Sequence, residues 1–194
     1  TVDFQVAQGG NERTIHLALP PFTLIGATTD PGMLARPLLA RFRIKQRLEP
    51  YGDEALAGVV VRAAERRGIA ISPDAAREIA RRSCGTPREA INLLGCAIEV
   101  AGRDGVGRIE IPHALEAARI EGIEADGLRK EQVAILRLLV ARDRPMGMGS
   151  IATALDIDER SVTAEHEPLL FRLGYIDRTW RGRVATAKGK ARVA

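Results

Sequence analysis

Two threonines and an arginine near the start of the chain could act on a phosphate group. The apolar start of the stretch 24–41, LIGATTDPGMLARPLLAR, predicts a buried strand, and Thr28 and Thr29 stand where it would end. Ligands bind at the carboxyl ends of strands in open α/β sheets, where a hydroxyl can orient a water molecule. Beyond a helical turn closed by Pro37, Arg41 could reach charge that develops in phosphoryl transfer. A core strand with a threonine turn and surface arginines is the alternative.

A second arginine lies in an unusual place for a cation. Thr86 and Pro87 predict a helix start, which puts Arg88 in the first turn. A cation there opposes the helix dipole and loses roughly 0.3–1 kcal/mol relative to an acid. Helix N-termini bind phosphate through bare amide groups, so a bound anion would explain the arginine. Neutralisation by Glu89, or a side chain that points to solvent, would explain it equally well.

The positive charge of the chain is concentrated at its C-terminal end. The formal net charge is +4, but residues 172–194 carry +6 and residues 1–171 carry −2. A basic segment on a near-neutral body suggests a polyanion partner, and a solvated basic tail is the alternative. Arg178, Arg181 and Arg183 flank a predicted turn that holds Trp180, the single tryptophan. Arginines on such a hairpin suit DNA phosphates and the minor groove, largely independently of sequence.

The elements before this hairpin complete a recognisable order. From Leu128 the pattern predicts three helices, the second capped by Ser150 and the third opened at Asp158 and ended at Gly174. Strands over 175–178 and 183–186 follow. Three helices and a hairpin describe a winged helix, which binds DNA or docks on proteins. The density of arginines favours DNA.

The middle of the chain predicts a small helical domain. Each helix has an apolar face and a start or stop signal of serine, threonine, proline or glycine. Helices are expected from Asp53 to Gly68, from Ser72 to Gly85, from Thr86 past Ile98, and from Pro112 to Ile120. Residues 122–127 form a linker, and the proline in Glu49-Pro50-Tyr51 makes a stiff joint at the other end.

The first fifty residues predict a sheet that is incomplete by itself. Apolar alternation around a glycine turn gives a hairpin over residues 2–19, and strands are expected over 22–29 and, as an edge strand, over 43–49. A two-stranded hairpin is not stable alone, so its apolar face must pack on this protein or on a partner. We expect these residues to end a larger domain whose beginning lies upstream of Thr1.

Composition excludes several classes of protein. Hydrophobic residues make up 45% and charged residues 28%, which is typical of a globular protein, and no apolar run is long enough to cross a bilayer. No signal peptide is expected, and Cys84 and Cys96, both within helical patterns, predict reduced thiols in a cytoplasmic protein. Neither the cysteines nor the three isolated histidines have metal-ligand spacing.

Three motifs in order give the chain a family resemblance. GATTDPGMLARPLLARF, CGTPREAINLL and EPLLFRLGYIDRTWRGRVAT resemble the RuvB family of Holliday junction branch-migration ATPases, over nearly the whole chain. The resemblance implies an α/β remnant of an AAA+ core with a hairpin plus strand, a mostly α-helical lid and a winged-helix DNA-binding head. On this basis we expect domains over residues 1–51, 52–123 and 124–194. It also implies an ATP-driven motor that pulls duplex DNA in recombination and repair, with Mg²⁺.

The resemblance implies roles at matching positions. Thr28 or Thr29 matches the family's sensor 1, and Arg41 its arginine finger, which reaches the nucleotide of a neighbouring subunit. Tyr51 lies at a joint where the family contacts nucleotide. Arg88 in GTPR matches sensor 2, which couples nucleotide state to the lid.

The resemblance also implies the macromolecular partners. Arg178, Arg181 and Arg183 match DNA-contacting arginines of the head, and Arg160 matches more weakly because the basic position is shifted by one. The hairpin over 2–19 matches the segment that docks on the junction-binding protein RuvA. A finger that acts between subunits implies a homohexamer.

The sequence also departs from the family pattern. Asp30 replaces a basic residue, Leu39-Ala40 replaces Arg-Asp, and Arg43 replaces glycine. No GxxxxGK[ST] P-loop and no Walker B acids occur in the 194 residues, so we expect this chain alone not to hydrolyse ATP. A non-enzymatic winged-helix DNA-binding or adaptor protein is the alternative. A clamp-loader-like subunit is a third possibility, against which the wing strands argue.

Overall fold

The computed structural model describes residues 2–8 and 11–194, with the side chains of His16 and of residues 18–194. Its internal contacts divide the chain into two compact units, residues 1–47 and 48–194. Each unit is therefore described by itself.

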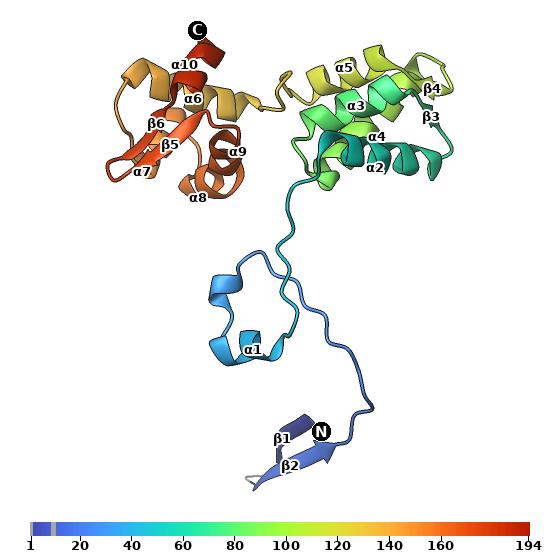
Figure 1. The fold of residues 1–194 in the computed structure, drawn as a ribbon, viewed down its shortest axis with the longest axis vertical. Coiled ribbons are helices and arrows are strands. Elements are labelled where there is room, and N and C mark those ends of the chain that lie inside the picture. The colour runs from blue at the N-terminus through green and yellow to red at the C-terminus, as the bar shows by residue number, and fades with distance from the viewer. Residues whose placement is uncertain (1, 9–10) are drawn as a thin grey trace. The chain divides into compact units, whose positions relative to one another are not determined.

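The first unit contains the predicted hairpin. Strands β1 (Val2–Gln8) and β2 (Asn11–Leu17) pair antiparallel, with Phe4 opposite Ile15 (Figure 1). The glycine turn between them, and the side chains that would form its apolar face, lie outside the described residues. A 3₁₀ turn, η1 (Pro31–Met33), and the short helix α1 (Arg36–Arg41) follow.

Two of the strands predicted in the first fifty residues are not formed. Residues 22–29 and 43–49 form neither strand nor helix, and Phe22, Leu24 and Ile25 are 67%, 62% and 87% exposed. A strand is held by hydrogen bonds to a neighbouring strand, and the described part of this unit pairs only β1 with β2. The prediction that Pro37 closes a helical turn is also wrong. Pro37 is the second residue of α1, where a missing N–H costs nothing.

The second unit begins with the predicted helical domain. Its helices are α2 (Asp53–Glu65), α3 (Pro73–Arg82), α4 (Pro87–Arg103) and α5 (Ile111–Ile120), and the two-residue strands β3 (Ala70–Ile71) and β4 (Arg108–Ile109) pair in parallel between them (Figure 1). The Ser72 hydroxyl accepts a hydrogen bond from the amide of Ala75, as its cap position predicts. Leu56, Ile79 and Leu94 are among the fully buried core residues.

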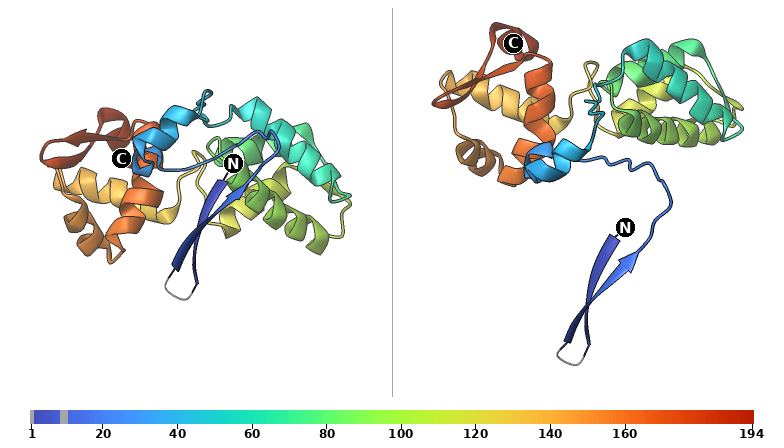
Figure 2. Two further views of the ribbon diagram at one scale, coloured as in Figure 1. Left: turned by 90° about the horizontal axis from the view of Figure 1, so that it is seen from below. Right: turned by 60° about the horizontal axis from the view of Figure 1, so that its bottom comes forward.

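The rest of the second unit has the winged-helix order predicted from the sequence. It comprises α6 (Lys130–Arg142), α7 (Met148–Leu155), α8 (Glu159–Ser161), a π-helical turn over Val162–His166, α9 (Glu167–Arg172), and strands β5 (Ile176–Thr179) and β6 (Gly182–Ala185). Figure 2 shows the β5–β6 hairpin projecting from the helices that carry it. Asp158 caps α8 as predicted, but Gly147 precedes α7 and Ser150 lies within that helix.

A last helix replaces the basic tail considered from the sequence. Helix α10 (Ala187–Val193) starts at Thr186, whose hydroxyl accepts a hydrogen bond from the amide of Gly189. Gly189 is buried, and Lys190 pairs with Asp143 at the end of α6. The C-terminal helix is therefore packed on the winged helix through one face, while Lys188 and Lys190 remain exposed.

The linker 122–127 is held by hydrogen bonds from both sides. Arg81 and Arg82, at the end of α3, donate to the carbonyls of Ala125 (2.6 Å) and Ile123 (2.9 Å). From the other side the Tyr175 hydroxyl donates to Asp126 (2.8 Å), which also pairs with Arg192 (2.6 Å). The linker is thus an ordered connection between the helical domain and the winged helix.

No helix among the described residues is both long and apolar enough to cross a membrane. The two cysteines are free and partly buried. Cys96 lies within α4, but Cys84 follows the end of α3 with a φ of +48°, so the prediction that both lie in helices holds for Cys96 alone.

We expect Gly189→Ala to lower the free energy of unfolding by about 1–3 kcal/mol, because overpacking of a tight contact costs about that much. A Cβ at residue 189 would collide with the carbonyl oxygen of Tyr175 and lie 3.0 Å from Leu136 Cδ1. Gly95→Ala is the matched control, since Gly95 is also helical and its Cβ would meet nothing within 4 Å. The control should stabilise by roughly 0.5–1 kcal/mol. Denaturant unfolding measures both, and equal effects would contradict the packing of α10.

Candidate nucleotide and DNA sites

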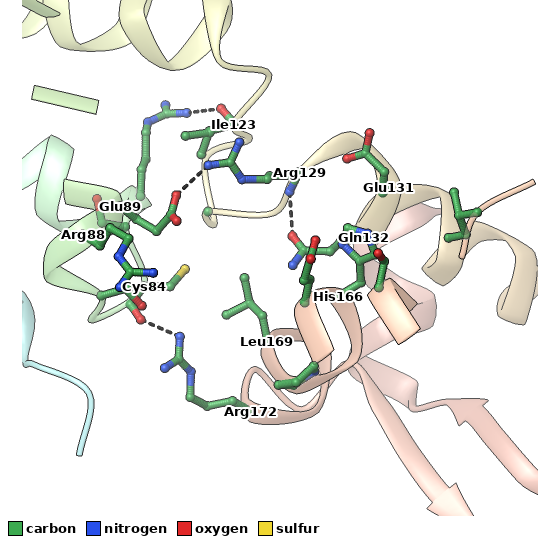
Figure 3. Close-up of a pocket in the computed structure, with 18 of the residues that line it drawn as sticks. Cys84, Arg88, Glu89, Ile123, Arg129, Glu131, Gln132, His166, Leu169 and Arg172 are labelled. Atoms are coloured by element: carbon green, nitrogen blue, oxygen red, sulfur yellow. Dashed lines mark hydrogen bonds and ion pairs between the residues drawn. The ribbon is translucent and has the colours of Figure 1, made fainter. Parts of the chain in front are cut away.

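The start of α4 presents backbone amides and a cation to an open cavity. Thr86 precedes the helix but its hydroxyl makes no capping hydrogen bond, and Arg88 is exposed in the first turn. The cavity has a volume of about 990 Å³, and Arg88, Glu89, Arg129 and Arg172 are among its lining residues (Figure 3). Uncapped amides beside an arginine are suited to a phosphate group.

Glu89 does not neutralise Arg88. The carboxylate of Glu89 accepts a hydrogen bond from Arg129 Nη2 at 2.6 Å, across the cavity of Figure 3. This excludes one of the two ordinary explanations for a first-turn arginine. It also ties the first turn of α4 directly to the residue before α6.

The structure brings Tyr51 to the same helix start. The amide of Tyr51 donates to the carbonyl of Gly85 at 2.9 Å, three residues before Arg88. Gly85 has a φ of +77°, and a Cβ there would lie 2.7 Å from Pro50 Cβ and 2.8 Å from the Tyr51 carbonyl oxygen. A glycine is therefore needed for this close approach. Tyr51 and Arg88, two residues predicted to contact nucleotide, flank the same backbone turn.

A third arginine and a thiol complete this wall of the cavity. Arg172 donates from Nη2 to the carbonyl of Cys84, which links α9 to the end of α3. Burial raises the pKa of the Cys84 thiol above its ordinary value, although the charge of Arg172 acts in the opposite direction. Cys84 is thus a neutral packing residue here.

Thr28, Thr29 and Arg41 lie in the first unit and are exposed. The hydroxyl of Thr28 accepts a hydrogen bond from the amide of Asp30 at 3.1 Å, and Asp30 in turn caps η1 through Gly32. Arg41 is the last residue of α1, where a cation is favoured by the helix dipole. The part of the chain that the structure describes contains no cluster of three or more histidine, cysteine, aspartate or glutamate side chains that could hold a metal ion.

Two of the predicted DNA-contacting arginines share one buried carboxylate. Glu167 accepts hydrogen bonds from Arg178 Nε (2.8 Å) and from Arg183 Nε (2.8 Å) and Nη2 (3.1 Å). The Glu167 side chain is 2% exposed, whereas that of Arg178 is 58% exposed. One charge out of two is neutralised, and the exposed guanidinium of Arg178 remains accessible to a phosphate.

The environment of Glu167 keeps its carboxyl ionised. Burial raises the pKa of this carboxyl, but hydrogen bonds and charges from Arg183 and Arg178 outweigh burial and bring the pKa below its ordinary value of 4.5. None of the sequence motifs pointed to Glu167. The available signal was an acid three residues before buried Leu170, on the face of α9 that packs into the core.

The tip of the wing carries the remaining arginine of the hairpin. Among residues 2–8 and 11–194, the guanidinium of Arg181 makes no hydrogen bond or ion pair, and it lies 4.4 Å from the centre of the Trp180 ring. Arg160 is exposed on α8, and its amide is used to cap that helix through Asp158. Arg178 and Arg183 are brought together by Glu167, while no contact joins Arg160 to them in the described structure.

Three protein-family models match the chain in succession. The model described as "Holliday junction DNA helicase RuvB P-loop domain" matches residues 1–48. "RuvB AAA lid domain" matches residues 51–124, and "RuvB C-terminal winged helix domain" matches residues 125–193.

Curated relatives and solved structures give the same family. The chain is 43% identical over 192 residues to the Holliday junction branch migration complex subunit RuvB of Synechococcus sp. (strain CC9311), with 97% of the chain and 54% of the relative aligned. The RuvB of Chlorobium chlorochromatii (strain CaD3) is 39% identical, over 100% of the chain and 55% of the relative. The solved Thermotoga maritima RuvB Holliday junction branch migration motor has a TM-score of 0.79 and 34% identity, covering 89% of this chain and 59% of that one. The chain thus spans about half the length of these relatives.

We expect Glu167→Gln to lower the free energy of unfolding by about 1–3 kcal/mol at neutral pH, because an amide cannot replace the charged acceptor of two arginines. A depressed carboxyl pKa contributes stability above the unfolded-state value, and this contribution is lost as pH falls through the folded value. The difference between the two proteins should therefore shrink as pH falls below 4.5 and disappear once pH has fallen through the lower folded-state pKa, where wild-type Glu167 becomes neutral.

Denaturant unfolding between pH 3 and pH 7 tests this dependence. Glu165→Gln, an exposed neighbour in the same helical segment, is the control and should change stability by less than about 0.5 kcal/mol. A difference between wild type and Glu167→Gln that is constant with pH would show that the charge of Glu167 is not what matters.

Proposed function

Since the chain belongs to the RuvB family, we propose that it is part of an ATP-driven DNA motor that promotes branch migration of Holliday junctions in recombination and repair. The observation that carries this proposal is the arginine-rich hairpin on a winged helix, connected by an ordered linker to a helix start suited to phosphate. A motor needs both features, because the state of the nucleotide at one site must change the affinity for DNA at the other.

We assign residues 1–51 to the end of the ATPase domain, 52–123 to the lid and 124–194 to the DNA-binding head. The relatives are almost twice as long as this chain, and the 194 residues contain no P-loop and no Walker B acids. Phosphoryl transfer needs the lysine and the Mg²⁺ ligands of those motifs. In this proposal the chain alone binds DNA but does not hydrolyse ATP.

The nucleotide-contacting roles fall to residues of both units. Arg88 acts as a sensor of the terminal phosphates at the start of α4, and Tyr51 packs beside the nucleotide. Arg41 stabilises charge on the nucleotide of an adjacent subunit, and Thr28 or Thr29 orients the attacking water. ATP with Mg²⁺ supplies the free energy for movement.

The head binds duplex DNA through charge rather than sequence. Arg178, Arg181 and Arg183 contact backbone phosphates, and Arg160 adds a contact from α8. Glu167 fixes the first and last of the wing arginines in one geometry, which reduces the entropy lost on binding.

The proposed assembly is a homohexamer in the cytoplasm. The hairpin over residues 2–19 docks on a RuvA-like junction-binding protein, which would cover an apolar face that a two-stranded sheet cannot bury by itself. Relatives are named subunits of a branch migration complex, which supports the existence of such a partner.

The lid–head contacts provide a route for coupling. Glu89 adjoins Arg88 in sequence and pairs with Arg129 of the head segment, so a phosphate that moves the start of α4 also acts on α6. The same cavity wall includes the Arg172 contact to the carbonyl of Cys84.

Arg178→Ala should weaken duplex binding a few-fold at low salt and reduce the slope of log K against log salt by about 1, since one phosphate contact is lost. Glu167 would stay paired with Arg183, so the fold should be retained. Fluorescence anisotropy of a labelled duplex at several salt concentrations measures the slope. Arg66→Ala, at an exposed position after α2, is the control, and equal slopes for wild type and Arg178→Ala would remove this arginine from the interface.

Arg41→Ala should abolish hydrolysis without abolishing nucleotide binding. The measurement uses a protein in which a RuvB-family Walker A and Walker B segment precedes Thr1, and an arginine finger contributes about 10³-fold or more to such a rate. Arg36→Ala, at the other end of α1, is the matched control. Full activity of the Arg41 variant would show that Arg41 is an ordinary surface residue and not an arginine finger.

A further inference from the structure

Trp180 is a large apolar side chain on the most basic element of the protein. It is 87% exposed, and it stands at the turn of the hairpin between Arg178 and Arg183. Phosphate binding gives no reason for an exposed indole at this position. The ring therefore requires an explanation beyond the charge of the wing.

The turn that carries Trp180 is held firmly. The hydroxyl of Thr179 donates to the carbonyl of Gly182 (2.9 Å) and accepts from the amide of Arg181 (3.2 Å). Below the turn, Met146 and Arg183 exchange two backbone hydrogen bonds of 2.9 and 2.8 Å. A side chain displayed on an ordered turn loses less entropy when a ligand binds to it.

The guanidinium of Arg181 supports the ring. It lies 4.4 Å from the centroid of Trp180, which is the geometry of a cation–π contact. The guanidinium thus occupies one side of the ring, and the high exposure of Trp180 leaves the ring open to a further planar group. An aromatic ring beside arginines fits a ligand that has both flat π-faces and negative charges.

Nucleic acid has both properties. In a perfect duplex the faces of the bases are stacked on one another and closed to a side chain, whereas an unpaired base exposes its face. Base stacking on an aromatic side chain tolerates any base sequence, as does phosphate binding by the wing. Branch migration, as proposed above, separates base pairs and forms new ones, so unpaired bases belong to the process.

We propose that Trp180, supported by Arg181, is a stacking site for an unpaired nucleobase in the DNA that the wing holds. This inference rests on the proposed DNA-binding function of the head. It adds a contact to bases to the contacts with phosphates, and it assigns Trp180 the role of distinguishing opened DNA from fully paired DNA.

Trp180 is the only tryptophan of the chain, so intrinsic fluorescence reports on this site alone. The full chain is titrated with three DNAs of equal length and charge: a perfect duplex, a duplex with a central unpaired stretch, and the same duplex with abasic sugars in that stretch. Fluorescence of the protein reports stacking, and anisotropy of a dye on the DNA reports affinity.

We expect the unpaired bases to quench Trp180 fluorescence and the abasic sugars not to do so. The unpaired bases should also raise affinity over the abasic duplex by roughly 5- to 150-fold, the range for stacking of one base on an aromatic ring. Trp180→Ala should remove that difference in affinity, and Trp180→Phe should keep most of it. Because Trp180 is exposed, both variants should unfold at the same denaturant concentration as the wild type.

Equal quenching and equal affinity for the base-containing and abasic duplexes would overturn the stacking site while leaving the phosphate-binding wing intact. The same holds if Trp180→Ala keeps the preference for unpaired bases. If the wild-type chain bound none of the three DNAs, the proposed DNA-binding function would be overturned, and the stacking site with it.

Discussion

The wing depends on a single buried carboxylate. Glu167 lies at the start of α9, in the core of the winged helix, and accepts three hydrogen bonds from Arg178 and Arg183 on opposite strands of the hairpin. A buried carboxylate without partners would be costly, so the fold and the position of the two arginines stabilise one another. The result is a hairpin whose base is fixed and whose tip presents Arg181 and Trp180.

Pairing with carboxylates also explains why the basic residues of the C-terminal end are less available to an external anion than their number suggests. Asp126 in the linker accepts from Arg192 and Tyr175, and Asp143 pairs with Lys190. Burial raises the pKa of Asp126, but the hydrogen bonds of Arg192 and Tyr175 bring it below the ordinary value. Much of the +6 charge of residues 172–194 therefore stabilises structure, and Arg181 at the tip of the wing, with the exposed part of Arg178, is left to meet an external anion.

The contacts across the cavity connect the two places where anions are proposed to bind. Glu89 does not pair with its sequence neighbour Arg88, because its carboxylate pairs with Arg129. Arg129 immediately precedes α6. Hydrogen bonds from Arg81, Arg82 and Arg172 hold the linker and the end of α3 in register with this pair. Through these contacts, a displacement at the start of α4 would also displace the helices that carry the wing.

Sequence alone determined the elements whose signals act within one helical turn. The starts of α3, α4 and α8 follow from Ser72-Pro73, Thr86-Pro87 and Asp158, and the hairpin arginines follow from a local motif. Only the tertiary structure decided which charges are free: the partners of Glu167 are 11 and 16 residues away, and those of Asp126 are 49 and 66 residues away. The residues 22–29 failed as a strand for the same reason, since a strand needs a neighbour and a run of apolar residues cannot supply it.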